Sequence, residues 1–290
     1  MADGLLHTLR QLIDHGSVAW SAVSATQRKE LRPLLATGVL MQERSGGGQR
    51  LVVANASVLK RFARQRYPSG IAEAAEAARN AHALSPAAGV HHFRDAKRGV
   101  QSADMLLLRG QPASTLTCGG TPIPVGDLTA IAGATAVVLE ADRAVSMTGT
   151  LAIVENQTAF LRAHALGVPF DVALYGSGRL SKRVLTWLGS PSMQEVAIVH
   201  CPDYDPVGLS EYSRLHACCG DRVRLHCPAN IEHFIQTYGK PSLYQKNIGQ
   251  LPAAQDLPAD GAHVAALLER YGCGLEQEIL VMNTEKGGRK

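Results

Sequence analysis

The sequence lacks the features that mark membrane, secreted and fibrous proteins. The uncharged run Leu128–Leu139 has 12 residues, whereas a membrane-spanning helix needs about 20. The first 16 residues carry His, Arg and Asp within their apolar stretch, which is unlike a signal peptide. None of the 6 cysteines forms a Cys-x-x-Cys pair. We therefore expect a cytoplasmic protein that contacts no membrane and keeps its cysteines as free thiols.

Several nucleotide-binding and hydrolase motifs are absent as well. There is no Gly-x-x-x-x-Gly-Lys-Ser/Thr loop and no Gly-x-Ser-x-Gly turn, so neither a P-loop nor an α/β-hydrolase nucleophile is indicated. The run GSGRLS at 176–181 lacks the third glycine of a dinucleotide fingerprint. With 46% hydrophobic and 19% charged residues over 290 positions, the composition is typical of a globular protein of about two domains.

Charge divides the sequence unevenly. Residues 1–110 hold 15 Lys and Arg against 8 Asp and Glu, a net charge of +7, and residues 111–290 hold 14 against 17, a net charge of −3. This asymmetry predicts a polyanion-binding module joined to a part that uses carboxylates. An uneven solvated surface is the alternative interpretation.

Residues 1–67 show the element order of a winged helix-turn-helix domain. Apolar spacing and turn residues predict a helix, a short strand, a helix, a hairpin and a helix over residues 4–15, 18–20, 24–37, 39–54 and 57–67. In that fold a recognition helix enters the major groove of DNA and the hairpin, or wing, contacts the backbone.

The basic side chains of this domain predict contacts with double-stranded DNA. Those on the second helix and on the hairpin are placed for phosphate contacts, which give affinity without sequence choice. The expected DNA-contacting residues are Arg28, Lys29, Arg32, Arg44 and Arg50. A winged helix that serves in protein docking or dimerisation is the alternative.

Residues 68–149 are expected to connect the two parts through a linker and β elements. Residues 69–88 are rich in Ala and Pro and predict a short helix, and strands are predicted over 105–109 and 136–140. His91 and His92 are expected in a basic loop. Because neighbouring histidines seldom share one ion without a third ligand nearby, we interpret them as surface residues.

Strands and helices alternate over residues 150–282. Four short apolar runs, in TLAIVEN, DVALYG, EVAIVHC and VRLHCP, predict strands with helices between them. This alternation predicts an α/β domain whose parallel sheet is covered by helices on both faces. In such sheets the working residues gather at the carboxyl ends of the strands. Residues 283–290 are expected to form a flexible tail.

Acidic residues stand at these strand ends. Glu155 follows one strand, and Asp203 and Asp205 follow another. The i, i+2 spacing puts the two aspartates on one side of an extended segment. Clustered carboxylates repel each other unless a partner neutralises them, and Mg²⁺ prefers carboxylate and phosphate oxygens. The pattern therefore predicts a metal site for phosphoryl transfer.

The same segments carry a family resemblance. VENQTAF, YGSGRLSK and HCPDYDPVGL together resemble the Toprim domain of topoisomerases, primases and related nucleases. With a winged helix in front of it, that order resembles the topoisomerase VI A-subunit group. Within the group, GLEQEI (274–279) and the Asp-x-Asp-Pro-x-Gly run are most similar to the nuclease subunit of Wadjet (MksBEFG) anti-plasmid systems.

The resemblance implies a Mg²⁺- or Mn²⁺-dependent DNA endonuclease with an N-terminal winged helix-turn-helix and a C-terminal, Rossmann-like Toprim domain. It makes Glu155 the general acid or base and a metal ligand. It makes Asp203 and Asp205 the residues that hold Mg²⁺ or Mn²⁺. Glu276 or Glu278 is a candidate for bridging a second ion, although an exposed acidic helix face explains these glutamates as well.

The turn after the second of these strands is a candidate for phosphate contact. Gly176 and Gly178 would let a phosphate approach the following helix, with Lys182 and Arg183 near it. A tight strand–helix turn explains the two glycines equally well.

The resemblance also implies partners. The nuclease would act as a homodimer, one site on each DNA strand, together with an SMC–kleisin (condensin-like) complex that presents plasmid DNA. Two alternatives are a relative that binds DNA or such a complex without cutting, and a tyrosine transesterase like the topoisomerase VI A subunit. None of the 7 tyrosines lies in residues 1–66, where the transesterase nucleophile would stand, so hydrolysis is favoured. Tyr67, next to Pro68, is expected to pack at a helix end.

Overall fold

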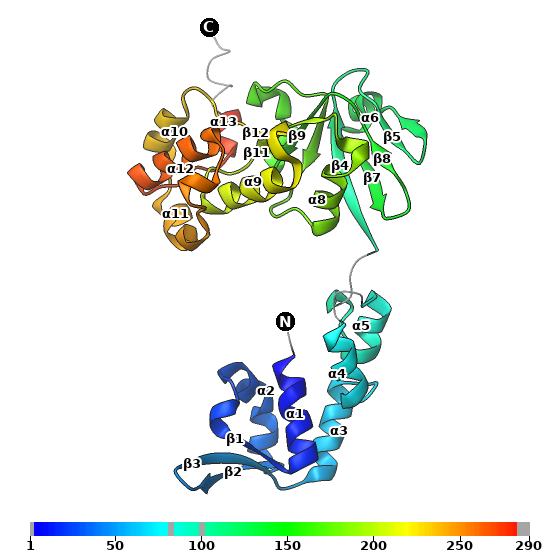
Figure 1. The fold of residues 1–290 in the computed structure, drawn as a ribbon, viewed down its shortest axis with the longest axis vertical. Helices are drawn as coiled ribbons and strands as arrows, with labels where there is room; N and C mark the ends of the chain where they lie inside the picture. Colours follow the sequence, from blue (N-terminus) through cyan, green and yellow to red (C-terminus); the bar gives the residue numbers. More distant parts are fainter. Residues whose placement is uncertain (1–2, 81–83, 99–101, 283–290) are drawn as a thin grey trace. The chain divides into compact units, whose positions relative to one another are not determined.

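The chain folds into two compact units, residues 1–102 and 103–290 (Figure 1). The computed structural model describes residues 3–80, 84–98 and 102–282. Each unit has its own apolar core. The region that we expected to connect two parts, 68–149, is divided between the units. The tail predicted over 283–290 lies outside the described residues.

The N-terminal unit combines helices with a small antiparallel sheet of order β1-β3-β2. Its elements are α1 (Gly4–His15), β1 (Ser17–Ala19), α2 (Ala25–Ala36), β2 (Leu40–Ser45), β3 (Gly48–Val53), α3 (Ala56–Arg66), α4 (Ile71–Arg79) and α5 (Pro86–Phe93). The helices and the hairpin predicted over residues 1–67 are confirmed. Leu9, Leu31, Leu51 and Leu59 are fully buried and join α1, α2, β3 and α3 in one core.

Side-chain caps explain where the first helices begin. Asp3, Ser24 and Asn55 accept hydrogen bonds from backbone N–H groups in the first turns of α1, α2 and α3, which satisfies donors that the helix itself leaves free. Ser24 and Gln27 form a reciprocal capping box.

The expectation of a basic loop at His91 and His92 is wrong, because both residues lie on α5. Ser85 caps this helix and Pro86 occupies its first turn, a position where the fixed φ of proline favours helix formation. The helix then continues to Phe93, which is buried in the core.

A six-stranded, mostly parallel sheet of order β12-β11-β9-β10-β4-β7 forms the centre of the second unit. Its strands are β4 (Ala103–Gly110), β7 (Thr135–Glu140), β9 (Thr150–Val154), β10 (Val172–Tyr175), β11 (Ala197–Cys201) and β12 (Val223–Leu225). The first four strands in this order run parallel, whereas β4 is antiparallel to β10 and β7 is antiparallel to β4. The α/β class is confirmed, and the four strands predicted over residues 150–282 run parallel. The strands β4 and β7, which come from the region before residue 150, make the whole sheet mixed.

Burial patterns give the physical reason for the mixed sheet. Four consecutive residues of β9, Leu151–Val154, are buried, which requires cover on both faces of the strand. In β4 and β7 buried and exposed residues alternate, and Met105 is 80% exposed. Such alternation is typical of antiparallel strands with one face open to solvent.

Helices and a small second sheet complete this unit. The helices are α6 (Val125–Ala132), α7 (Gln157–Leu161), α8 (Lys182–Leu188), α9 (Pro206–Cys219), α10 (Ile231–Tyr238), α11 (Pro241–Asn247), α12 (Ala259–Tyr271) and α13 (Glu278–Met282), and the small sheet joins β5 (Leu116–Cys118), β6 (Thr121–Ile123) and β8 (Val145–Ser146). Within the described ranges, no helix combines the length and the apolar character needed to cross a membrane.

Candidate active site

The first two acidic residues meet where the neighbouring parallel strands β9 and β11 end. Val154 and Cys201 are register partners at these ends. The N–H of Glu155 donates to the carbonyl of Cys201 at 3.1 Å, and the N–H of Asp203 donates to Oε2 of Glu155 at 3.2 Å. Parallel pairing therefore brings together two of the predicted site residues.

Asp205 is held by the helix that follows it. Its buried carboxylate caps α9, and Oδ1 accepts the N–H of Gly208 at 2.8 Å. A Cβ at position 208 would lie 2.0 Å from the carbonyl oxygen of Asp203, so only glycine fits this close approach. Asp205 and Gly208 thus fix the loop that carries Asp203.

Gln277 joins the ends of both strands, a role that sequence reasoning missed. Its side chain is fully buried. Nε2 donates to the carbonyl of Cys201 at 2.7 Å, Oε1 accepts the N–H of Asn156 at 3.1 Å, and its own N–H donates to Oδ1 of Asp203 at 2.7 Å. GLEQEI contains this glutamine, but nothing in the motif indicates which distant backbone groups its amide would contact.

A short backbone pairing reinforces this junction. Tyr204 and Leu275 exchange two backbone hydrogen bonds of 2.8 and 2.9 Å. Gly274 lies next to them, where a Cβ would come within 3.0 Å of Cβ of Asp205. Residues 274–278 therefore hold the acidic loop 203–205 against the sheet.

The two glutamates of this segment point to different partners. Oε1 of Glu278 accepts hydrogen bonds from Nδ2 of Asn156 at 3.0 Å and from Oγ1 of Thr158 at 3.3 Å. Glu276 forms an ion pair with Nζ of Lys240 at 2.6 Å. The predicted metal ligand Glu278 thus contacts the start of α7, while Glu276 pairs with Lys240, the residue that precedes α11.

Burial and mutual repulsion raise the pKa values of the carboxyl groups. Burial, followed by the charge of Asp203, raises the pKa of Glu155 to about 7. Burial, followed by the charges of Asp205, Glu276 and Glu278, raises the pKa of Asp203 to about 6. Burial also raises the pKa of Asp205. The charges that raise the pKa values of Glu155 and Asp203 belong to other carboxylates, so negative charge gathers at this edge of the sheet.

The donor set fits a hard divalent cation, since it consists of carboxylate oxygens. Glu155 and Asp203 are the pair best placed to share an ion. Asp205 faces the N-terminus of α9 instead, so the three do not form a closed cage. In the described part of the chain, the group of three ligand atoms that all lie within 4.8 Å of one another belongs to Glu73, His91 and His92 of the N-terminal unit.

The turn between β10 and α8 holds its basic residues in different ways. Ser181 caps α8 and donates to Oδ2 of Asp104 at 2.9 Å, and Arg183 pairs with the same carboxylate at 3.3 Å. Lys182 is exposed. Gly178 has φ +82°, a conformation that favours glycine. Of the two predicted phosphate contacts, Lys182 is therefore the more accessible one.

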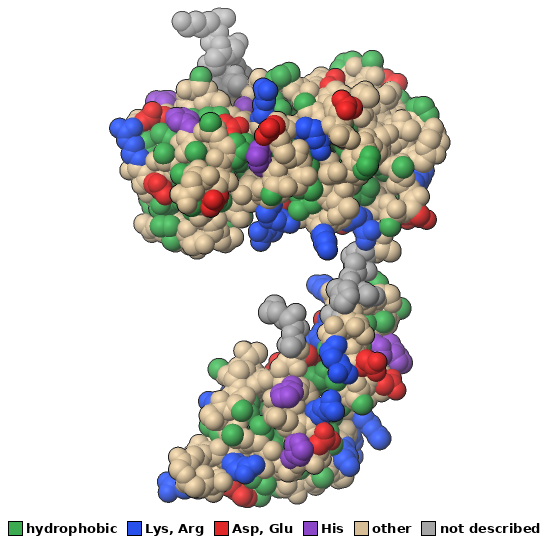
Figure 2. Space-filling view, in the orientation of Figure 1, with side chains coloured by type: hydrophobic (Ala, Val, Ile, Leu, Met, Phe, Trp, Pro, Cys, Tyr) green, Lys and Arg blue, Asp and Glu red, His purple; other side chains and the backbone are tan. Residues whose placement is uncertain are grey.

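The basic residues predicted to contact DNA lie on α2 and on the β2–β3 hairpin. Lys29, Arg32, Arg44 and Arg50 are exposed. Arg28 is half-buried, with its guanidinium 4.3 Å from the centre of the Trp20 ring and a 2.9 Å hydrogen bond to the Trp20 carbonyl. Figure 2 shows further Lys and Arg side chains over α3. Arg28 thus orders the helix start, while the other four face solvent.

Comparisons with known proteins add no family to this description. Neither the models of protein families nor the curated proteins give a match to the chain. Roles for the acidic loop and the basic surface therefore rest on their geometry and on the sequence motifs.

Replacing Gln277 should loosen the junction of β9 and β11. We expect Gln277→Ala to lower the free energy of unfolding by about 2–3 kcal/mol, because the two side-chain hydrogen bonds are lost and their buried backbone partners stay unsatisfied. Urea denaturation measures this difference. Gln250→Ala, at an exposed position, is the matched control and should cost under about 0.5 kcal/mol. Equal effects of the two changes would contradict the assigned role.

The pKa of Glu155 predicts a pH-dependent stability. A carboxyl group whose folded pKa is raised stabilises the fold below its unfolded pKa and loses that contribution as pH rises through the folded value. In EDTA, wild type should therefore lose stability relative to Glu155→Gln between about pH 4.5 and 7, by about 1.4 kcal/mol per pH unit at most. Denaturation of both proteins at pH 5 and pH 8 measures the difference. A gap that is the same at both pH values would contradict the raised pKa.

Proposed function

We propose that this protein is a metal-dependent DNA endonuclease with a winged-helix domain and a Toprim domain. The observation that carries the proposal is the meeting of Glu155 and Asp203 at the carboxyl ends of two adjacent parallel strands. Ligand and reaction sites of open α/β sheets lie at this edge. Acidic side chains there suit phosphodiester hydrolysis with Mg²⁺ or Mn²⁺.

The arrangement of elements supports the finer fold assignment. Helix, strand, helix, hairpin and helix follow one another in residues 4–66, and β1 pairs with β3 beside the hairpin. That is the order of a winged helix. In the second unit, the acidic loops follow β9 and β11, as the Toprim motifs VENQTAF and HCPDYDPVGL require. The antiparallel strands β4 and β7 extend the sheet on one side.

Each residue of the acidic site would have a distinct role in phosphodiester hydrolysis. A divalent cation bound by Glu155 and Asp203 would neutralise phosphate charge and lower the pKa of a water molecule. With no cation bound, burial raises the pKa of Glu155 to about 7; its carboxylate would serve either as a ligand of the cation or as the group that accepts a proton from water. Gln277 orients the carboxylate of Asp203 through its N–H. Asp205 keeps the loop in place as the cap of α9.

A tyrosine transesterase is less well supported. Tyr67, the tyrosine nearest to the hairpin in sequence, is 2% exposed and packs edge-on against Phe93. Burial raises its pKa, which opposes formation of the phenolate. A buried hydroxyl of this kind is poorly suited to attack a DNA phosphate, so hydrolysis is the preferred reaction.

The biological setting follows from the resemblance. We propose that the protein works as a homodimer, one site per DNA strand, and that an SMC–kleisin complex presents plasmid DNA to it as part of a defence system. The alternative is a protein that binds DNA or the SMC complex without cutting. The hydrogen bond that joins Glu155 and Asp203 in one acidic site favours the enzyme.

Cleavage of supercoiled plasmid with Mg²⁺ or Mn²⁺ tests the enzyme. We expect wild type to nick or linearise the plasmid, and Glu155→Ala and Asp203→Ala to lose at least about 100-fold in rate. Glu195→Ala, which removes an exposed carboxylate, should keep full activity. Full activity of Glu155→Ala would overturn the proposal. Metal binding without cleavage, even with the SMC complex added, would favour the binding-only alternative.

Removing the hairpin arginines tests the DNA-binding surface. We expect the double variant Arg44→Ala/Arg50→Ala to bind duplex DNA more weakly, with the slope of log K against log salt reduced by about 2. Arg224→Ala/Arg270→Ala removes the same charge from exposed positions of the second unit and serves as the comparison. Fluorescence anisotropy at several salt concentrations gives both slopes. An unchanged slope in the hairpin variant would point to a docking role for this domain.

A further inference from the structure

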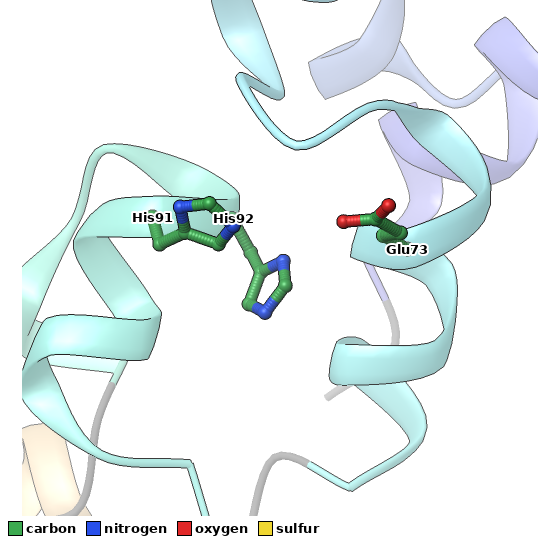
Figure 3. Close-up of side chains that lie close together, drawn as sticks. All are labelled: Glu73, His91 and His92. Carbon is green, nitrogen blue, oxygen red and sulfur yellow. The ribbon is translucent and has the colours of Figure 1, made fainter.

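A second group of metal-ligand side chains lies on the N-terminal unit. Glu73 projects from α4, and His91 and His92 lie in the last turn of α5. Figure 3 shows the carboxylate of Glu73 facing the two imidazole rings. Each residue offers one ligand atom, and these three atoms all lie within 4.8 Å of one another.

The third ligand changes the interpretation of the histidine pair. Neighbouring residues on a helix point about 100° apart, so two adjacent histidines rarely hold an ion alone. Here the ring centroids are 4.8 Å apart and the rings are nearly perpendicular. Glu73 adds a ligand of opposite charge from a second helix, 18 positions earlier in the sequence.

The geometry needs little change to accept an ion. Two ligands of a tetrahedral zinc ion lie roughly 3.4 Å apart, given bonds of about 2.0–2.1 Å. Glu73 and His91 are exposed, so rotation of their side chains can close the remaining gap. The His92 ring is already restrained, because its Nδ1 lies 2.8 Å from the hydroxyl oxygen of Ser69.

The donor chemistry selects the kind of ion. Imidazole nitrogens suit zinc and other late transition metals, whereas Mg²⁺ and Ca²⁺ prefer oxygen. Two histidines and one glutamate are a set that proteins use for Zn²⁺, with a fourth position left to water or another ligand. This donor set differs from the oxygen-only site at Glu155 and Asp203.

We propose that Glu73, His91 and His92 bind a transition-metal ion such as Zn²⁺ and thereby tie α4 to α5. A bound metal ion would connect the two helices in the folded protein, and the unfolded chain has no such preformed site. The bound ion therefore stabilises the N-terminal unit by RT ln(1 + c/Kd), where c is the concentration of free metal, an amount that grows with the logarithm of the affinity. The site does not depend on the proposed nuclease function.

Titration of the full-length protein with Co²⁺ tests the proposal. Co²⁺ reports its ligands by visible absorption, and thiolate ligands give additional intense near-ultraviolet bands, so binding at the exposed Cys218 is recognised. We expect wild type to show a nitrogen–oxygen spectrum that Zn²⁺ abolishes. His91→Ala/His92→Ala and Glu73→Gln should each lose this spectrum, while His15→Ala, at another exposed helix end, should keep it.

Thermal melting separates loss of metal from loss of fold. In EDTA the variants should melt like wild type, since the replaced side chains are exposed or half-buried. Added Zn²⁺ should raise the melting temperature of wild type and His15→Ala but not that of the other variants. A Co²⁺ spectrum that is unchanged in His91→Ala/His92→Ala, or absent in wild type at millimolar Co²⁺, would overturn the proposal.

Discussion

The hydrogen bonds of Gln277 are the interaction on which the acidic site depends. One buried side chain satisfies the ends of two neighbouring strands and orients Asp203 through the adjacent backbone. Each bond is worth only about 1 kcal/mol net. A buried amide that satisfies several partners at once also restricts the backbone to one arrangement. The loop 203–205 is rigid because Gln277, Gly208 and the Tyr204–Leu275 pairing act on it together.

This rigidity carries an energetic cost. The carboxylates of Glu155, Asp203 and Asp205 lie in a partly buried region. Burial raises the pKa of each group, and neighbouring carboxylates raise the pKa values of Glu155 and Asp203 further. A fold selected for stability alone would not gather such groups. The cost is explained if the site binds a cation, and this links the packing of residues 274–278 to the proposed chemistry.

Much of this arrangement could be predicted from local patterns. Apolar runs located β9, β10 and β11, and the rule for parallel sheets placed Glu155 near Asp203. The part played by Gln277 could not be predicted, because its partner Cys201 is 76 residues away and no periodicity connects them. The antiparallel pairing of β4 with β10 was not predicted for the same reason, since the two strands are far apart in the sequence. Nothing in the sequence indicated that α4 would bring Glu73 close to the two histidines. The helix that contains His91 was predicted as a loop, although Pro86 is a residue typical of a helix start.

The pairing of residues 274–278 with the strand ends also sets the order in which the site is made. Asn156 and Gln277 are 121 positions apart, so the loop closure that joins them carries an entropic cost and requires both segments to have been synthesised. Before the ribosome has added residues 274–278, the strands β9 and β11 have already been synthesised, but Asp203 lacks its hydrogen bond from Gln277. A nascent chain would thus carry the acidic residues without the backbone restraint that positions Asp203, and the geometry of the candidate site would form only after synthesis of this segment.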